Sequence, residues 1–381
     1  MKITMSLPDL NEALAIVGRA VALKGVKPIL ANVLLLASEN EVKIAGTDLE
    51  IMVTSKIPAK VEKSGQCTIP AKIFLENVGS LYSASGEKEV VLSQLDGTEN
   101  QIEISAGRGK FNLQIQGIED FPPLPVVENQ DIPSFEIDSE LLKKPLQQVA
   151  IAMGMEEANV TQKSICFAFQ DESIKFTATD IHRLAISKVD KIQFPKEFQK
   201  NFLVPSRSIP EILKILDHGD KIRISLLNEQ LLFISKKFNL LTRLYDGRYP
   251  DFNRVIPKNI NSKIKLKSHD LLMALRVVSP IAKLNAGMFF LDTKTNETRI
   301  WSNSLHEGTT EMCISSELEG DPIEIAFNVK YVTDFLSVID SENVLIELIT
   351  PGFPGLFKPE NTETDYKYVI MPMREKKNEE D

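Results

Sequence analysis

The sequence predicts an α+β fold in which three tandem domains of similar size each pack two helices on antiparallel sheets. Two features of the 381-residue chain point to this fold: short markers that return about every 125 residues, and alternating apolar and polar stretches separated by six helical segments. The length agrees, because domains usually contain about 100–200 residues. Antiparallel sheets covered on one face by a helix pair satisfy this pattern.

The first marker is a polar turn at the end of an alternating stretch. Its three copies are Lys43-Ile-Ala-Gly-Thr-Asp-Leu-Glu50, Lys175-Phe-Thr-Ala-Thr-Asp-Ile-His182 and Arg299-Ile-Trp-Ser-Asn-Ser-Leu-His306. In this alignment Asp48, Asp180 and Ser304 correspond. A second marker returns in step with the first and begins at Thr68, Leu203 and Phe327. Two markers at nearly the same period argue against chance similarity.

Proline-rich stretches separate the expected domains. Phe121-Pro-Pro-Leu-Pro125 and Tyr249-Pro-Asp-Phe-Asn-Arg-Val-Ile-Pro257 have little potential for a helix or a central strand. Each is followed by an alternating stretch that indicates a new strand, at 134–138 and at 263–267. We therefore expect domains at 1–127, 128–257 and 258–374, followed by a highly charged tail at 375–381 that we expect to be disordered.

Each domain is expected to contain two smaller units, each with a strand, one helix and then several strands. The first helix is indicated by apolar residues at helical spacing, which are Leu10, Ala13, Leu14, Val17 and Val21. Ser6 and Asp9 form a capping box ahead of them. The six expected helices cover 8–24, 71–84, 139–154, 207–218, 269–284 and 329–340. Alternating segments between these helices predict about two dozen strands.

Charge and cysteine content exclude several classes of protein. The chain has 44 basic and 53 acidic side chains, a net charge of −9, which argues against a simple basic-patch nucleic-acid binder. No apolar run approaches the roughly 18 residues of a membrane span, and the first ten residues lack a signal-peptide core. Cys67, Cys166 and Cys313 are far apart in sequence, which favours buried free thiols in a reducing cytoplasm over disulfides or a zinc site.

Motifs of catalysis are missing from the sequence. It contains no Walker A loop, dinucleotide-binding glycine motif, HExxH or GxSxG, and the four histidines share no metal-ligand spacing. Gly107-Arg-Gly109-Lys110 resembles half of a phosphate loop, but its alternating surroundings favour a hairpin turn. We therefore predict no catalytic residues, no metal and no cofactor.

The densest polar cluster is Thr179-Asp-Ile-His-Arg183. A hydrolase could use Asp180, His182 and Arg183 as base, acid and anion anchor. Adjacent residues of a strand point to opposite faces, however, so these side chains cannot all converge on one substrate. We favour a turn that Asp180 stabilises, with a surface recognition element, and we keep the hydrolase as the alternative.

The end of the chain, Tyr368-Val-Ile-Met-Pro-Met-Arg374, has two interpretations. It can be an edge strand that ends the core, or an adaptable methionine-rich surface that binds short peptides. Composition alone does not choose between them.

Several segments together are typical of one family. They are Pro28-Ile-Leu-Ala-Asn-Val-Leu34, Thr179-Asp-x-His-Arg-Leu184, Asp246-Gly-Arg-Tyr-Pro-Asp-Phe252, Arg254-Val255, Phe327-Asn-Val-x-Tyr331 and the terminal 368–374. With the threefold repeat, they resemble the bacterial sliding clamps, the beta subunits of DNA polymerase III, from Met1 to Arg374. The chain is identified as a member of that family.

The resemblance implies three tandem DNA-clamp domains in a closed homodimeric ring, joined head to tail, with helices lining a channel around duplex DNA. Such a ring is a non-catalytic processivity factor of the cytoplasm, associated with the nucleoid, and it holds DNA by topology without sequence specificity. Phe111 and Leu113 match one side of the family's dimer interface, and Val278 and Ile281 are expected on the other. Lys24 and Lys27 are either DNA-contacting residues or ordinary solvated lysines.

The resemblance also implies a pocket between the second and third domains. It binds short linear motifs with Leu and Phe anchors in the replicative polymerase, the clamp loader and repair proteins. The expected pocket residues are Thr179, His182, Arg183, Leu184, Pro250, Arg254, Val255, Asn328, Tyr331, Val369, Met371, Pro372, Met373 and Arg374. This resemblance favours the second interpretation of the terminal segment, as a pocket wall.

Two positions depart from the family pattern. Ile181 stands where the family usually has Gly, and we expect a local backbone that accepts a side chain rather than one with positive φ. Gln162 stands where an apolar residue is common, which predicts a more polar subsite.

Overall fold

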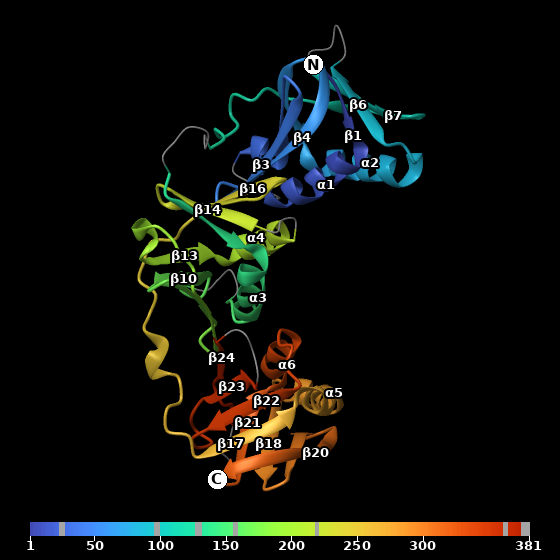
Figure 1. Ribbon diagram of the computed structural model, residues 1–381. Coiled ribbons are helices and arrows are strands. Elements are labelled where there is room, and N and C mark those ends of the chain that lie inside the picture. The colour runs from blue at the N-terminus through green and yellow to red at the C-terminus, as the bar shows by residue number, and fades with distance from the viewer. Residues whose placement is uncertain are drawn as a thin grey trace. The chain divides into compact units, whose positions relative to one another are not determined.

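The computed structural model describes residues 1–22, 27–94, 100–125, 132–154, 159–217, 221–360 and 365–374. These residues form six α-helices and 24 strands (Figure 1). The helices are α1 (Leu7–Val17), α2 (Ala71–Ser85), α3 (Ser139–Ala150), α4 (Ile209–Leu216), α5 (Ser268–Leu284) and α6 (Val329–Ser337). The predicted number of helices is therefore confirmed for the described residues.

The strands follow one order along the chain: a strand, a helix and three strands, repeated six times. The first eight strands are β1 (Lys2–Ser6), β2 (Asn32–Ser38), β3 (Glu41–Thr47), β4 (Ile51–Lys63), β5 (Gly65–Pro70), β6 (Glu89–Gln94), β7 (Gln101–Ala106) and β8 (Gly109–Gln114). The next eight are β9 (Ser134–Asp138), β10 (Ser164–Gln170), β11 (Ser173–Thr179), β12 (Arg183–Asp190), β13 (Asn201–Pro205), β14 (Lys221–Leu227), β15 (Gln230–Ile234) and β16 (Phe238–Arg243). The last eight are β17 (Ser262–Lys267), β18 (Met288–Lys294), β19 (Glu297–Ser304), β20 (Gly308–Gly320), β21 (Ile323–Asn328), β22 (Asn343–Leu348), β23 (Gly355–Pro359) and β24 (Asp365–Ile370). This order confirms the two strand–helix–strands units predicted for each repeat.

The first helix begins as predicted but ends early. Ser6 Oγ accepts a hydrogen bond from the backbone N–H of Asp9 at 3.2 Å, as an N-cap does. Helix α1 then ends at Val17, not at residue 24, because Gly18 follows and begins a short 3₁₀ turn. Helices α3, α4 and α6 also end two to four residues before the predicted positions. A prediction from apolar periodicity places the end of a helix too late when apolar residues at helical spacing follow the last helical turn.

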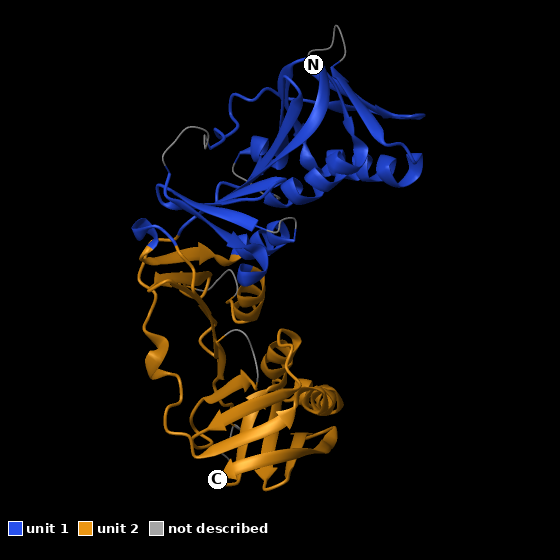
Figure 2. Ribbon diagram, in the orientation of Figure 1, with its two compact units in different colours: residues 1–142, 194–198, 207–244 blue, residues 143–193, 199–206, 245–381 orange. Residues whose placement is uncertain are grey.

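The chain forms two compact units, shown in blue and orange in Figure 2. The first unit contains residues 1–142, 194–198 and 207–244, and the second contains 143–193, 199–206 and 245–381. The strands of the central repeat are thus divided between the two units. The predicted boundary between residues 127 and 128 lies outside the described residues, and the three domain ranges stay a prediction.

Each unit contains one 12-stranded sheet. The longest path through the first sheet is β8-β7-β6-β1-β4-β16-β15-β14-β9, with β5, β2 and β3 joined through β4. The second sheet runs β13-β10-β11-β12-β24-β23-β22-β17-β20-β19-β18-β21. Within each sheet, one antiparallel strand pair joins two sequence repeats: β4 with β16 in the first, and β12 with β24 in the second. We call these pairs the first seam and the second seam.

Helices cover one face of each sheet. In the first unit, α1 packs against α2 and against β3 and β4, with Phe74 and Val78 of α2 fully buried. In the second unit, α5 lies on β18, β19 and β20 and packs against α6. Among the described residues, no helix is long and apolar enough to cross a membrane.

Two smaller predictions have different outcomes. Gly107 and Arg108 form the turn of a hairpin in which Ala106 pairs with Gly109, so the hairpin is confirmed. The prediction of buried thiols is confirmed for Cys67 and Cys166. It is wrong for Cys313, which is exposed. Cys313 faces solvent because its strand neighbour Ile314 takes the core-facing position.

Candidate functional site

The turn between β11 and β12 is the framework of the site. Thr179 Oγ1 donates to the carbonyl oxygen of Arg183 at 2.7 Å and accepts from the N–H of Ile181 at 3.1 Å. Asp180 Oδ1 accepts from the N–H groups of His182 and Arg183, at 3.1 and 3.0 Å. The prediction that Asp180 stabilises a turn is confirmed, since its carboxylate closes the loop as in an Asx turn.

Ile181 corrects an expectation. Its φ is +79°, so the backbone has the positive value that we did not expect for a residue with a side chain. The left-handed region costs an L-residue about 1–2 kcal/mol, and a β-branched side chain rarely enters it. The hydrogen bonds at Thr179 and Asp180 fix the turn strongly enough to hold Ile181 there, with 64% of its surface exposed.

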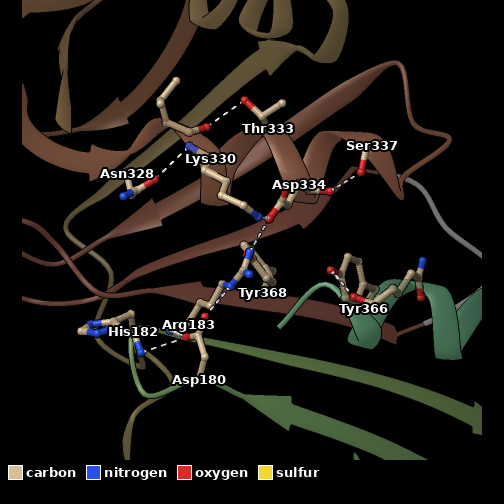
Figure 3. Close-up of polar contacts among 12 residues, drawn as sticks. Asp180, His182, Arg183, Asn328, Lys330, Thr333, Asp334, Ser337, Tyr366 and Tyr368 are labelled. Carbon is tan, nitrogen blue, oxygen red and sulfur yellow. Dashed lines mark hydrogen bonds and ion pairs between the residues drawn. The ribbon is translucent and has the colours of Figure 1, made fainter. Parts of the chain in front are cut away.

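Arg183 is the charged centre of the site, and it is only 7% exposed. Its Nε donates to Asp180 Oδ2 at 2.8 Å, and its Nη1 donates to Asp334 Oδ2 at 2.6 Å and to the Tyr368 hydroxyl at 3.2 Å (Figure 3). The guanidinium carbon lies 4.4 Å from the centre of the Tyr331 ring. Hydrogen bonds and ring contact together hold this cation in a single orientation.

The surroundings of Arg183 keep it charged. Burial would lower the pKa of the guanidinium, but the interaction with Tyr368 and the hydrogen bonds to Asp334 and Asp180 raise it overall. Burial also raises the pKa of the Tyr368 hydroxyl, so this neighbour stays neutral at physiological pH. Lys330 Nζ donates to the same Asp334 oxygen at 2.6 Å and adds an exposed positive charge. A buried cation between two carboxylates is the result.

Beside this network lies a cavity of about 290 Å³. Its lining residues are Asn159, Thr161, Gln162, Thr179, Ile181, Arg183, Leu184, Pro250, Phe252, Val255, Val369 and Met371. Leu184, Val369 and Val255 belong to one apolar cluster of the second unit. An apolar cavity with a few fixed polar groups suits an apolar anchor side chain.

Half of the predicted pocket residues line this cavity. They are Thr179, Arg183, Leu184, Pro250, Val255, Val369 and Met371. Gln162 also lines the cavity and is 8% exposed. Its side-chain oxygen accepts a hydrogen bond from the backbone N–H of Asn159, and the backbone N–H of Gln162 donates to Asn159 Oδ1. The sequence interpretation missed Asn159, Thr161 and Phe252, because nothing in their types marks them as pocket residues.

Three domain models of the DNA polymerase III beta subunit match most of the chain in order: the N-terminal domain at residues 1–125, the central domain at 136–251 and the C-terminal domain at 253–374. The chain belongs to the DNA polymerase III beta subunit family. Membership implies DNA, a polymerase and self-association as the general partners of the chain.

Individual relatives agree with the family models. The chain is 29% identical to the beta sliding clamp of Bacillus subtilis, over 98% of this chain and 100% of that protein. It is 28% identical to the beta sliding clamp of Synechococcus elongatus, over 98% and 99%. The solved sliding clamp of Bacillus subtilis superposes with a TM-score of 0.89 at 27% identity, covering 98% of this chain and 99% of that one. The beta subunit of Thermotoga maritima gives the same TM-score and coverage at 25% identity.

The other predicted pocket residues are not among the residues that line the cavity. His182 is exposed, and its carbonyl oxygen accepts from the N–H of Met371 at 2.8 Å. Arg254 is exposed, Asn328 caps α6 through the N–H of Lys330, and Tyr331 packs beneath Arg183.

The last three predicted residues follow Met371 along the chain. The N–H of Met373 donates to the carbonyl oxygen of Ala326 at 2.9 Å, and its side chain packs on a cluster that includes Phe290 and Trp301. Pro372 is half-buried and Arg374 is exposed. Met373 therefore supports the terminal segment from a different cluster than the one that lines the cavity.

The predicted dimer-interface residues differ in accessibility. Phe111 is half-buried and Leu113 is 8% exposed on β8, and Ile281 is half-buried on α5. Val278 is fully buried within its own unit, whereas the adjacent Val277 is 48% exposed, so Val277 and not Val278 offers its side chain at this place, and the interface itself stays a prediction. Lys27 is exposed, and Lys24 lies outside the described residues.

The first unit contains a close counterpart of the Thr179 turn. Thr47 Oγ1 donates to the carbonyl oxygen of Ile51 at 2.6 Å and accepts from Leu49 N–H, and Asp48 Oδ1 accepts from the N–H groups of Glu50 and Ile51. The φ of Leu49 is +77°, as at Ile181. The predicted equivalence of Asp48 with Asp180 therefore holds at the level of single hydrogen bonds.

The charges beside this first turn are arranged differently. Glu211 is 2% exposed and binds Arg19 Nε at 2.6 Å and Arg207 Nη1 at 3.2 Å. Arg207 Nε also lies 3.6 Å from Asp48 Oδ2. The hydrogen bond to Glu211 raises the pKa of Arg19. Here a buried carboxylate lies between two cations.

Proposed function

We propose that two copies of this chain close head to tail into a ring around duplex DNA, and that this ring tethers the replicative polymerase without catalysing a reaction. Family membership supports a clamp, and one geometric observation carries the ring: among the described residues, β8 and part of β20 have unpaired edges, and these two strands correspond to the strands already joined at the chain's own two seams. In this proposal the three domains keep the ranges 1–127, 128–257 and 258–374.

The two seams have the same register. At the first seam Val53, Thr54 and Ser55 of β4 face Leu240, Asn239 and Phe238 of β16. At the second seam Ala185, Ile186 and Ser187 of β12 face Tyr368, Lys367 and Tyr366 of β24. Since Asp48 corresponds to Asp180, β4 corresponds to β12, and each seam joins the same strand of one repeat to the last strand of the next.

Two strands of the same kind have an unpaired edge. Among the described residues β8 pairs only with β7, and no strand covers the outer edge of residues 308–315 of β20, which pair with β19 alone. Strand β8 contains Lys110-Phe-Asn-Leu113, identical to Lys237-Phe-Asn-Leu240 at the first seam. An exposed edge of this length invites pairing with another chain.

The expected third seam therefore joins β8 of one copy to β20 of another. Ser55, which faces Phe238 at the first seam, also pairs with Ile44 of β3, and Ile300, the counterpart of Ile44, pairs with Met312. Transfer of the seam register through these pairs therefore places Phe111 opposite Met312, Asn112 opposite Glu311 and Leu113 opposite Thr310. Thr310 Oγ1 donates to the carbonyl oxygen of Val277, which places this face of β20 next to α5. A head-to-tail contact of this kind must close or it would grow into a filament.

Apolar side chains on the helices beside these edges support the contact. Val277 of α5 is 48% exposed, and Ile73 and Tyr82 of α2 are 43% and 46% exposed. Burying such side chains stabilises an interface by about 25 cal/mol for each Å² of apolar surface. The half-buried Phe111 lies on β8 itself and the half-buried Ile281 lies on α5, and they extend the two apolar surfaces.

Encirclement explains how an acidic chain can work on DNA. A net charge of −9 disfavours tight phosphate binding, but a closed ring is held by topology and needs only weak contacts that permit sliding. Lys27 is exposed and available for such a contact, and Lys24 is proposed for the same purpose. The proposal locates the protein in the cytoplasm, on the nucleoid.

The ring is tested by its mass and its retention on DNA. The wild-type chain should sediment as a dimer, and Phe111→Lys, which places a charge in the expected third seam at a half-buried position, should sediment as a folded monomer. Lys88→Glu, on the loop after α2, is a surface control that should stay dimeric. After loading, the wild type should remain on nicked circular plasmid and leave when the plasmid is cut. A folded wild-type monomer, or equal retention on linear DNA, would reject the ring.

We further propose that the cavity beside Arg183 receives an apolar anchor of a short linear motif from a polymerase, the clamp loader or a repair protein. Its apolar wall of Leu184, Val255 and Val369 suits a leucine or phenylalanine side chain. The fixed guanidinium of Arg183 lies in the same wall and suits a carbonyl or carboxylate of the motif. The other expected residues, from His182 to Arg374, would contact the rest of the motif.

Two methionines near the end of the chain distinguish residues that line the cavity from residues that pack elsewhere. Met371 lines the cavity, whereas Met373 packs on the separate cluster of Phe290 and Trp301. Met371→Ala should weaken binding of a Leu/Phe-containing motif peptide about tenfold by calorimetry, since it removes roughly 1.4 kcal/mol of contact. Met373→Ala should have a smaller effect on affinity. Equal affinities for wild type and Met371→Ala would exclude this cavity as the anchor site.

A hydrolase is the weaker candidate. The Asp180 carboxylate is engaged by two backbone N–H groups and by Arg183, and Arg183 is held by Asp334 and Tyr368. His182 is exposed, and both of its neighbours are committed to the turn. Among the described residues no group of three His, Cys, Asp or Glu side chains could hold a metal ion. Hydrolysis abolished by His182→Ala would favour the hydrolase.

A further inference from the structure

The first unit contains a long groove that the clamp function does not use. Its cavity volume is about 720 Å³, within the range of sites that bind ligands. The groove lies between the sheet and the proline-rich segment 118–125, which we call the strap. Phe121 of the strap packs on Leu34 and Ala45, and this contact fixes the strap above the sheet.

The floor of the groove is one row of side chains that crosses seven strands. Residues directly opposite one another in this row are Gln66, Leu36, Lys43 and Lys56 on β5, β2, β3 and β4. The row continues with Thr54, Asn239, Ile234 and Arg223 on β4, β16, β15 and β14. Six steps between neighbouring strands amount to roughly 29 Å. An extended peptide of about eight or nine residues has this length.

The lining of the groove has a definite chemistry. Its charged members are Lys43, Lys56 and Arg223, and no Asp or Glu is among its described lining residues. Lys56 and Arg223 form exposed ion pairs with Glu41 and Glu136, both at 3.4 Å. Such surface pairs contribute little free energy, so both cations can turn toward an anionic ligand. Leu34, Leu36, Phe121 and Leu232 provide an apolar surface between the charges.

The equivalent place in the second unit is different. Its cavity has about 230 Å³ and is lined by Cys166, Ala168 and Lys175, the counterparts of Leu34, Leu36 and Lys43. The Tyr249 hydroxyl donates to the carbonyl oxygen of Thr177 at 3.1 Å and ties the second linker to the sheet. Asp251 adds a carboxylate to the wall. At the corresponding place among the described residues of the second unit, the cavity is thus shorter and less cationic.

We propose that this groove is a second docking site, which binds an extended acidic peptide segment of a partner protein with one large apolar side chain. The three cations of the groove require a negatively charged ligand, and the apolar lining residues accept one apolar side chain of that ligand. The length of the groove favours a peptide over a small anion. Docking here leaves the cavity beside Arg183 free, so one chain could hold two partners at once.

The test uses the full-length protein and a fluorescein-labelled peptide, Glu-Asp-Glu-Phe-Glu-Asp-Glu-Glu. Fluorescence anisotropy should show saturable binding that weakens as salt rises. The double variant Lys43→Glu, Arg223→Glu should weaken binding at least tenfold. Lys175→Glu, the matched change in the second unit, should leave it unchanged, and so should Met371→Ala. Circular dichroism would establish that each variant is folded.

Four results would overturn the proposal. The first is no saturable binding up to millimolar peptide, and the second is equal binding of a peptide with lysine in place of each acidic residue. The third is preferential binding of oligothymidine, which would make the groove a nucleic-acid site. Replacement of the phenylalanine by serine should weaken binding about fivefold, and an unchanged affinity would reduce the site to an adventitious charge effect. None of these outcomes depends on ring closure or on the Arg183 cavity.

Discussion

The two Thr-Asp turns, Thr47–Ile51 in the first unit and Thr179–Arg183 in the second, have one backbone and two different electrostatic centres. In both turns the Thr hydroxyl donates one hydrogen bond and accepts one, the Asp carboxylate accepts two, and the third residue has positive φ. The fifth residue is Ile51 in one and Arg183 in the other. The turn therefore depends on the Thr-Asp pair, and the fifth side chain is free to serve another purpose.

The neighbouring charges adapt to that fifth residue. Where it is Arg183, a buried cation binds Asp180 and Asp334. Where it is Ile51, the buried charge is Glu211, and Arg19 and Arg207 surround it. The buried charge beside the turn is therefore positive in the second unit and negative in the first, although the strand pairing at the two seams is the same. In the second unit the exchanged residue also lines a cavity, which gives that seam its proposed binding function.

The largest expected effect is at Arg183. Its replacement by Ala leaves Asp180 and Asp334 without their common partner, and we expect a loss of about 3 kcal/mol in the free energy of unfolding. Urea denaturation followed by fluorescence of Trp301, the only tryptophan of the sequence, measures it. Arg254→Ala, an exposed arginine in the same unit, should change stability by less than about 0.5 kcal/mol. Equal effects of the two changes would contradict a structural centre at Arg183.

A smaller effect is expected at Glu211 in the first unit. Glu211→Gln removes the charge, but the side chains of Arg19 and Arg207 are 50% and 36% exposed and can be hydrated when they lose it. We expect a loss of about 1.5 kcal/mol, measured by urea denaturation with circular dichroism. A loss larger than that of Arg183→Ala would show that the buried anion, and not the buried cation, is the more important centre.

The smallest effect has the opposite sign. Ile181→Gly and Leu49→Gly each relieve a positive φ, and each should stabilise its unit by roughly 1 kcal/mol after the added flexibility of the unfolded chain is counted. Only Ile181 lines the cavity, so Ile181→Gly should weaken binding of the motif peptide several-fold and Leu49→Gly should not. Thermal unfolding and calorimetry measure the two quantities. Destabilisation by both changes would mean that the turns carry no strain.

The sequence predicted what depends on local pattern. The Thr-Asp markers, the six strand–helix–strands units and the cap at Ser6 are short-range features, and the structure agrees with them. The resemblance to the family brought Leu184, Pro250 and Val369 into one expected pocket, and all three line the same cavity.

What the sequence could not predict depends on distant contacts. Arg183 binds Asp334 and Tyr368, which are 151 and 185 residues away along the chain, and no local pattern links them. The φ of Ile181 is imposed by the turn against the preference of a β-branched residue. The difference between Val277 and Val278 arises from the rotation of α5 on its sheet, which periodicity fixes only to within a residue.

The central claim, a third seam that closes a ring, is tested most directly by a disulfide. Asn112→Cys and Glu311→Cys, in a Cys313→Ser background, place two thiols at positions that should face each other between copies. The reduced protein is incubated with closed circular plasmid and then oxidised. We predict a covalent dimer that stays on the plasmid in sodium dodecyl sulfate and is released when the plasmid is cut. Failure to cross-link, open-ended oligomers, or release by detergent from the intact circle would contradict the ring.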